Sequence, residues 1–315
     1  MNPAFSVIFF TTASGAGYGV LMMLGALALT GTVRPLLFFI ALVPAFMLVT
    51  FGLLASLFHL GHPERAWRAL SQWRSSWLAR EGVVAIATYV PSGVAFAWVL
   101  FGGGGTPAWR AVAPATALLA VATVISTGMI YASLKPIPRW NNGWTVPVYL
   151  AFSVATGAMV LAPVALFVDR AAFDVAAWTA CAASLVAWTL KLGYWRMIGT
   201  ARPAATTGRA IGIEHLGPVR LMEGPTTGAN YITREMGFQV ARRHARRLRL
   251  IGGVVGGIAA PALALAGAVI PSTMAAFVVA LLALFAASLG VLIERWLFFA
   301  EAEHMSMLYF GAGPG

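Results

Sequence analysis

A polar stretch between two long apolar segments holds many of the side chains that could do chemistry in this chain. Between residues 59 and 81 lie two of the five histidines, two of the ten carboxylates and four arginines. Histidine exchanges protons near neutral pH, and a partly buried carboxylate can do the same. In an otherwise apolar chain, this cluster indicates a site for protons or for a polar headgroup.

His59 and Glu81 are the two members of this stretch best placed for such chemistry. His59 ends one apolar segment and Glu81 begins the next, so antiparallel neighbours would bring both to one membrane depth. A quinone needs hydrogen-bond donors for its carbonyl oxygens and a route for two protons. Further side chains could orient Glu81 or stack on the ring, although snorkelling toward the interface also explains each arginine: Arg65, Arg74, Arg80 and Trp67.

Haem and zinc are two other groups that histidines could hold. A haem inside a bundle usually needs two facing histidines, but all five lie in loops or at the ends of apolar segments. A haem at the rim stays an alternative. His59 and His62 are weak evidence for zinc, because a glycine and a proline interrupt the helix and no third ligand is near. The single cysteine, Cys181, excludes an all-cysteine iron–sulfur site, so we expect no metal here.

The elements that must position this stretch are membrane helices. The chain has 315 residues, 60% hydrophobic and only 10% charged, whereas soluble domains carry about 25% charged residues. A helix needs about 20 apolar residues to cross a bilayer core. The sequence predicts an all-α integral membrane bundle, one transmembrane domain over 1–315, with eight spans near 6–30, 36–58, 82–101, 111–134, 145–168, 173–197, 250–270 and 273–299.

Positive charge is distributed unevenly among the predicted loops. The loops after the second, fourth and sixth spans hold 15 of the 21 Lys and Arg residues, and those after the first, third and fifth hold one each. Because Lys and Arg concentrate on the cytoplasmic side, both termini and the arginine-rich loops are predicted to be cytoplasmic. Topology also accounts for the net charge of +11, and we expect no nucleic-acid partner.

The predicted cytoplasmic loop 198–249 is long and ends in a basic segment. Arg242, Arg243, Arg246 and Arg247 directly precede the seventh span. Such a cluster can pin the next span and contact anionic membrane lipids. Long loops are also often functional, so docking of a soluble partner is an equally good interpretation, and both can hold.

Charged residues within the spans are either a structural ion pair or the basis of a second class of function, a transporter or a proton pump. Glu294 and Arg295 are expected to face the bundle interior, with Lys191 or Arg196 as partners. A secondary transporter should place charge at the membrane midplane and show inverted repeats, whereas most charge here lies at the rim. A proton pump that uses Glu294, Arg295 and Lys191 is a variant of this alternative.

Small residues in the first span predict close packing against another helix. Ser14, Gly15, Ala16, Gly17 and Gly19 surround Tyr18. Small side chains let helix backbones approach closely in membranes. Tyr18 could line a cavity at that contact.

Several segments have sequences that are similar to those of known membrane proteins. They are MNPAFSVIFFTT at 1–12, HLGHP at 59–63, RAW at 65–67 and WRSSWLARE at 73–81. These segments resemble the DmsC family, the membrane anchor subunits of dimethyl sulfoxide reductase-type molybdoenzymes. The resemblance covers the whole chain and is strongest in the N-terminus and the loop before Glu81.

The resemblance implies a haem-free anchor in the bacterial inner (cytoplasmic) membrane. Such an anchor exchanges electrons between ubiquinone or menaquinone and an iron–sulfur subunit, which in turn serves a catalytic subunit with molybdopterin guanine dinucleotide. The resemblance implies that His59 and Glu81 form the quinone site, with Gly61 and Arg65 contributing. Trp67 stands where the respiratory dimethyl sulfoxide reductase anchors have Phe.

The N-terminal sequence resembles the anchors of membrane-bound sulfite dehydrogenases of the SoeABC type more closely than the enteric dimethyl sulfoxide reductase anchor. That resemblance implies quinone reduction with electrons from sulfite, and the alternative is quinol oxidation for a dimethyl sulfoxide reductase. Topology models of the family have also placed the quinone loop on the periplasmic side. The arginine distribution of this chain favours the cytoplasm.

Overall fold

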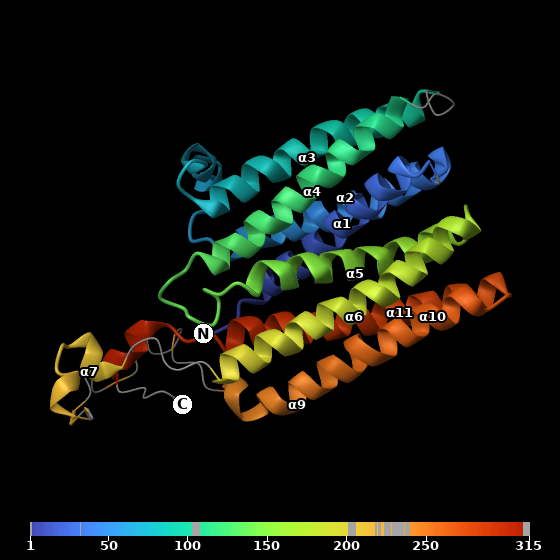
Figure 1. Cartoon of the computed structure of the whole chain (residues 1–315). Helices are drawn as coiled ribbons and strands as arrows, with labels where there is room; N and C mark the ends of the chain where they lie inside the picture. The colour runs from blue at the N-terminus through green and yellow to red at the C-terminus, as the bar shows by residue number, and fades with distance from the viewer. Residues whose placement is uncertain are drawn as a thin grey trace.

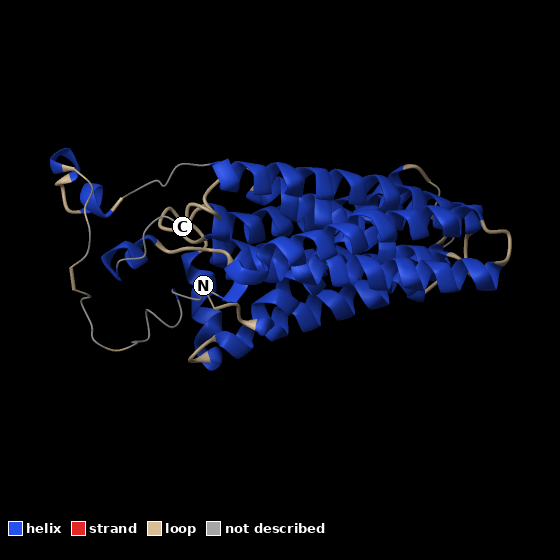
Figure 2. Cartoon of the chain, turned by 90° about the horizontal axis from the view of Figure 1, so that it is seen from below, coloured by secondary structure: helices blue, strands red, loops and turns tan. Residues whose placement is uncertain are grey.

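The described part of the chain is built of helices. The computed structural model describes residues 2–31, 33–102, 108–200, 206–217, 219, 222–223, 228, 236 and 240–310, and no strand occurs among them (Figure 2). Among the described residues, eight helices are long and apolar enough to cross a membrane, which confirms the predicted all-α bundle. The long elements are α1 (Phe5–Leu29), α2 (Pro35–Ala55), α3 (Trp77–Leu100), α4 (Ala108–Ala132), α5 (Thr145–Ala165), α6 (Arg170–Thr200), α9 (Val240–Val254), α10 (Ala260–Val269) and α11 (Thr273–Ala300).

One end of the bundle carries most of the short helices. The start of α1 and the end of α11 lie there, and we call this end the termini face (Figure 1). Tight connections join α1 to α2, α5 to α6 and α10 to α11 at the opposite end. The short elements at the termini face are η1 (Ser56–His59), η2 (Pro63–Gln72), α7 (Thr207–Ala210), η4 (Glu214–Leu216) and η6 (Met305–Phe310).

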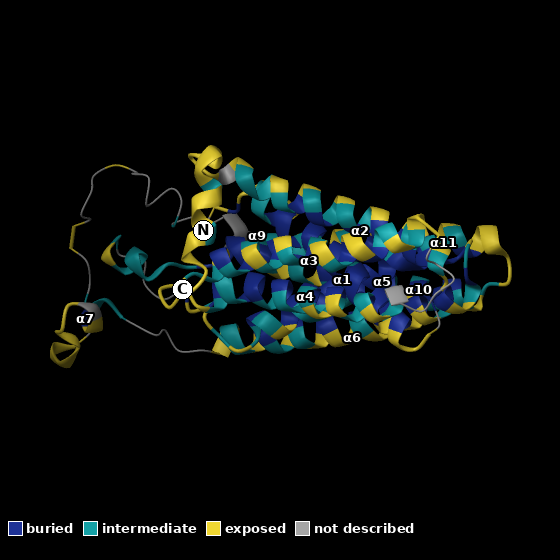
Figure 3. Ribbon diagram, turned by 90° about the horizontal axis from the view of Figure 1, so that it is seen from above, coloured by how far each residue is buried: buried dark blue, intermediate teal, exposed yellow. Residues whose placement is uncertain are grey.

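Helix α1 forms the centre of the bundle, packing against α2, α4, α5 and α11. Its glycines permit these crossings. A Cβ added at Gly19 would lie 1.8 Å from the carbonyl oxygen of Ser153 in α5, and one at Gly17 would lie 2.7 Å from that of Ala45 in α2. The predicted close packing of this segment is confirmed. Exposed residues lie mainly on the outer faces of the helices and at the two ends of the bundle, as Figure 3 shows.

The seventh membrane-crossing segment is interrupted by a π-helical turn. This turn, η5 (Val255–Ala259), joins α9 to α10. Its Gly256 leaves room for two neighbours, because an added Cβ would lie 2.6 Å from the Trp188 ring and 3.0 Å from the Cα of Gly290. Helix α9 starts ten residues before the predicted span at 250, so the basic segment is helical. Arginine is a good helix former, and Ala245 and Leu248 pack on the core.

Candidate functional site

Glu81 is a buried carboxyl group near the termini-face end of α3. The helix begins at Trp77, before the predicted span at 82, because the Ser76 side chain caps it by accepting a hydrogen bond from the Ala79 N–H at 3.4 Å. Glu81 is therefore inside the first turns of the helix instead of preceding it. Its side chain is only 4% exposed, and a buried carboxyl group needs a hydrogen-bond partner.

Thr127 of α4 provides that partner. Its hydroxyl donates to Oε1 of Glu81 and also contacts the carbonyl oxygen of Thr123, at 3.0 Å. A hydroxyl has one hydrogen but can also accept. It can donate to an ionised Glu81, or accept from a protonated Glu81 while it donates to the helix carbonyl. The pair thus keeps a hydrogen bond in both protonation states.

Tyr18 of α1 adds a buried hydroxyl to the same region. It is only 1% exposed and makes no hydrogen bond of standard geometry, and the polar groups nearest to it include Glu81 and the Thr123 hydroxyl. A buried unsatisfied hydroxyl is unfavourable by about 1–3 kcal/mol. A ligand oxygen next to Glu81 would satisfy it, so Tyr18 and Glu81 together suit a ligand that accepts a hydrogen bond and exchanges protons.

Arg80 secures the turn beside Glu81. Its guanidinium donates to the carbonyl oxygens of Trp73 and Arg74, at 2.9 and 2.7 Å, and lies 4.3 Å from the centroid of the Trp77 ring. Leu70 of η2 packs on the neighbouring Gly82, where an added Cβ would lie 2.7 Å from its methyl group. Arg80 therefore fixes the turn between η2 and α3, and Leu70 packs η2 on α3.

The other predicted site residues of this stretch lie on the surface. Arg65 pairs with the exposed Glu64 at 3.6 Å, and Trp67 is 68% exposed, with Arg68 stacked near it. The structure therefore does not bring these side chains against Glu81. The backbone of His59 ends η1 at the termini face, and its side chain lies outside the described part of the chain. The exposed members of the predicted site are Gly61, Arg65, Trp67 and Arg74.

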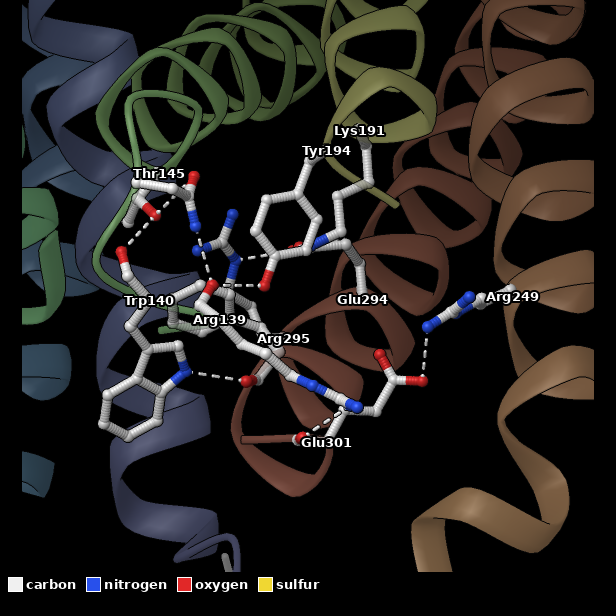
Figure 4. A network of polar contacts seen from close by, with 11 residues as sticks. Arg139, Trp140, Thr145, Lys191, Tyr194, Arg249, Glu294, Arg295 and Glu301 are labelled. Atoms are coloured by element: carbon white, nitrogen blue, oxygen red, sulfur yellow. Dashed lines mark hydrogen bonds and ion pairs between the residues drawn. The ribbon is translucent and has the colours of Figure 1, made fainter. Parts of the chain in front are cut away.

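A second polar centre lies among α5, α6 and α11 (Figure 4). Glu294 contacts Lys191 Nζ at 2.6 Å through Oε1 and Arg295 Nε at 2.6 Å through Oε2, and all three side chains are at most 2% exposed. The prediction of Lys191 as a partner is confirmed, whereas Arg196 is exposed and is not a partner. Each cation also lies near a tyrosine ring, Lys191 Nζ 3.9 Å from Tyr194 and Arg295 Cζ 3.8 Å from Tyr149.

A polar network connects this centre to the termini face (Figure 4). The Tyr194 hydroxyl donates to the carbonyl oxygen of Arg139 at 2.8 Å, and Arg139 donates to the carbonyl oxygen of Glu301 at 2.8 Å. The carboxylate of Glu301 pairs with Arg249 of α9 at 2.8 Å. These contacts lead from the buried charges to the termini face.

The basic segment of α9 divides into inward and outward arginines. Arg249 turns inward to Glu301, whereas Arg246 and Arg247 are exposed near the termini face. The side chains of Arg242 and Arg243 lie outside the described part of the chain. The two exposed side chains are free to contact lipid or a partner.

Comparison with known proteins places the whole chain in one family. The family model described as "DMSO reductase anchor subunit (DmsC)" matches residues 1–300. A sulfite dehydrogenase subunit of Allochromatium vinosum is 33% identical over 330 aligned positions, which cover 98% of this chain and 99% of that protein. The matched range 1–300 spans the positions of Glu81 and of the Lys191–Glu294–Arg295 cluster. The chain therefore belongs to the DmsC family of membrane anchor subunits, as its N-terminus and its 59–81 segment predict.

Proposed function

We propose that this chain is the quinone-reactive anchor of a membrane-bound sulfite dehydrogenase. Family membership supports a role as the anchor of a molybdoenzyme complex. The end-to-end match to a sulfite dehydrogenase subunit supports sulfite as the electron donor. The terminal substrate binds in a partner subunit, and this chain supplies only the quinone half-reaction.

The observation that carries this proposal is the buried Glu81–Thr127 pair, with the buried hydroxyl of Tyr18 in the same region. A bound ubiquinone or menaquinone supplies the chemistry of accepting two electrons and two protons. Tyr18 would donate a hydrogen bond to a carbonyl oxygen of the ring, and Glu81 would hold a proton for it. Thr127 keeps Glu81 hydrogen-bonded before and after that transfer.

The remaining residues of the stretch would surround this pair. His59 ends η1 at the same face and is proposed as a second proton carrier. Arg80 fixes the turn that leads from η2 into α3, just before Glu81. The exposed side chains would form the rim through which a headgroup enters: Gly61, Arg65, Trp67 and Arg74.

We further propose that the termini face is cytoplasmic, in a bacterial inner membrane. The arginine-rich connections lie at this face and favour that orientation. An iron–sulfur subunit would dock there, joined to a subunit with molybdopterin guanine dinucleotide. Its contacts would include the basic segment of α9: Arg242, Arg243, Arg246 and Arg247.

The second candidate function is quinol oxidation for a dimethyl sulfoxide reductase, which the description of the matching family favours. The same residues would serve, with protons leaving through Glu81 instead of arriving. Assays of the purified complex with sulfite and with dimethyl sulfoxide distinguish the two. Turnover with sulfite and quinone, and none with quinol and dimethyl sulfoxide, is the expected result.

Glu81→Gln tests the quinone assignment. The amide keeps the shape and a hydrogen bond to Thr127 but carries no exchangeable acid proton. Sulfite:quinone turnover should fall about 100-fold or more, while complex assembly and reduction of an artificial dye by the soluble subunits stay normal. Glu64→Gln, which changes an exposed carboxylate of the same stretch, is the matched control. Normal quinone turnover in Glu81→Gln would sink the assignment.

A further inference from the structure

Glu81 is almost completely enclosed by protein, although the proposed function requires a headgroup to reach it. Its side chain is only 4% exposed, and Thr127 of α4 contacts one of its carboxyl oxygens. A headgroup can therefore reach Glu81 only if a surrounding element moves. The elements that border it include α4, α1 with the buried Tyr18, and η2, whose Leu70 packs on the adjacent Gly82.

Helices α1 and α4 are held firmly in the bundle. Deeper in the membrane, the buried hydroxyls of Thr88 in α3 and Thr123 in α4 lie 3.5 Å apart. The backbone of α1 is close to α4, because a Cβ added at Gly25 would collide with Ala117. A movement of either helix would expose many buried side chains, so these helices open only at a high cost in free energy.

Helix η2 is the weakly held element of the three. It is a 3-10 helix of ten residues without a buried side chain, and 3-10 runs longer than about four residues are uncommon because their hydrogen-bond geometry is poor. Ala66 and Leu70 are half-buried, and its other residues are exposed. Segments that bury so little apolar surface open locally at a low cost in free energy. Movement of η2 is therefore the least costly way to uncover Glu81.

The two ends of η2 are attached differently. At the α3 end, Arg80 donates to two carbonyl oxygens of the turn 73–76 and fixes it. At the other end, Gly61 has open space around it, because an added Cβ would meet nothing within 4 Å. Between them, Leu70 lies directly on Gly82, where an added Cβ would be 2.7 Å from its methyl group. Release of this one contact would let η2 swing about the fixed turn.

We propose that η2 is a gate over Glu81, which opens when Leu70 leaves Gly82 and admits a quinone headgroup between η2 and α3. The proposal rests on the proposed function, in which Glu81 holds a proton for that headgroup. Trp67 and Trp73 are 68% and 50% exposed, and tryptophan is favoured at the membrane interface. The gate thus lies where a headgroup leaves the lipid, and its closure excludes bulk water from the buried carboxyl group.

A reversible cross-link tests the gate in the intact complex. After Cys181 is replaced by Ser, Leu70→Cys with Gly82→Cys puts two thiols where the leucine lies on the glycine, and oxidation joins η2 to α3. We expect sulfite:quinone turnover to fall about tenfold or more on oxidation and to recover on reduction, while dye reduction stays normal. Each single-cysteine variant, oxidised in the same way, is the matched control and should keep its turnover.

Chemical labelling of Glu81 measures the gate without quinone turnover. Dicyclohexylcarbodiimide is a hydrophobic reagent that modifies protonated carboxyl groups, and mass spectrometry gives the rate at which it reaches Glu81. This rate should fall about tenfold when the cysteine pair is oxidised. It should rise in Leu70→Ala, which removes the contact with Gly82. Labelling of Glu294, which is buried among α5, α6 and α11, should not change in either case.

The two measurements separate the gate from the proposed function. If Glu81→Gln retains quinone turnover, the proposed function fails and the role of η2 in quinone entry fails with it. If Glu81→Gln loses turnover but the oxidised cysteine pair keeps it, only the gate is overturned. Should the two thiols not join, the labelling rate in Leu70→Ala decides. A rate equal to that of the wild type would show that η2 does not control access to Glu81.

Discussion

At the scale of single residues, the Thr127 hydroxyl is the hydrogen-bond partner that the buried Glu81 can keep in either protonation state. This hydroxyl has one hydrogen and lies within hydrogen-bond distance of both the Glu81 carboxyl group and the Thr123 carbonyl oxygen. Thr127→Val keeps the side-chain shape but leaves the carboxyl group without this partner, a loss of about 1–3 kcal/mol. We expect quinone-linked turnover to drop about tenfold while dye reduction persists.

Thr116→Val is the matched control for this change. Thr116 is a buried threonine of the same helix, within hydrogen-bond distance of Val112 and Ser92 and not of Glu81. It should leave quinone turnover near the wild-type value. Equal effects of the two substitutions on turnover would show that Thr127 matters only for packing.

The sequence predicts the charged members of the polar centres better than the neutral ones. Lys191 and Glu294 are predicted partners because an intramembrane charge needs one. Thr127 and Tyr18 carry no comparable signal, since hydroxyl residues are common in membrane helices and their partners depend on how helices pack. Arg65 and Trp67 are close to Glu81 along the chain, but η2 lies on the surface and presents them to solvent.

At the scale of elements, the central position of α1 depends on glycines that have no room for a side chain. A Cβ at Gly19 would overlap the backbone of α5, and backbone cannot move aside as a flexible side chain can. Gly19→Ala should separate α1 from α5, with a destabilisation of about 1–3 kcal/mol or more. Thermal unfolding of the detergent-solubilised complex should show a lower midpoint.

Gly93→Ala in α3 is the control for this prediction, because an added Cβ meets nothing within 4 Å. Alanine is favoured over glycine within helices by about 0.5–1 kcal/mol. This variant should therefore unfold at the wild-type temperature or slightly above it. A midpoint for Gly19→Ala as high as that of Gly93→Ala would contradict the close crossing.

The eight spans are predictable because each must contain a long apolar run. The first residues of α3 and α9 cannot be predicted in the same way, because the first turns of these helices carry polar and charged residues that hydropathy assigns to loops. The π-helical turn η5 has no hydropathy signal either. It lies where Trp188 and Gly290 pack against Gly256, a contact between segments far apart in the sequence.

At the scale of the whole molecule, the uneven charge predicts which end faces the cytoplasm. We expect the termini face to be cytoplasmic because it carries the arginine-rich connections. After Cys181 is replaced by Ser, a single cysteine at the exposed Ser71 would report on the termini face, and one at the exposed Pro271 would report on the opposite end. A membrane-impermeant maleimide should label Pro271→Cys in intact spheroplasts and Ser71→Cys only after lysis. The reverse pattern would place the termini face outside.

The exposed arginines of α9 are the part of the termini face best suited to hold a soluble partner by charge. Each exposed ion pair contributes about 0–1 kcal/mol, so Arg246→Gln with Arg247→Gln should weaken docking by up to about thirtyfold. The soluble subunits should then leave the membrane at lower salt, which sedimentation over a salt series measures. Arg34→Gln, an exposed arginine at the opposite end, is the control. Identical salt profiles for both variants would mean that these α9 arginines contact lipid instead of the partner.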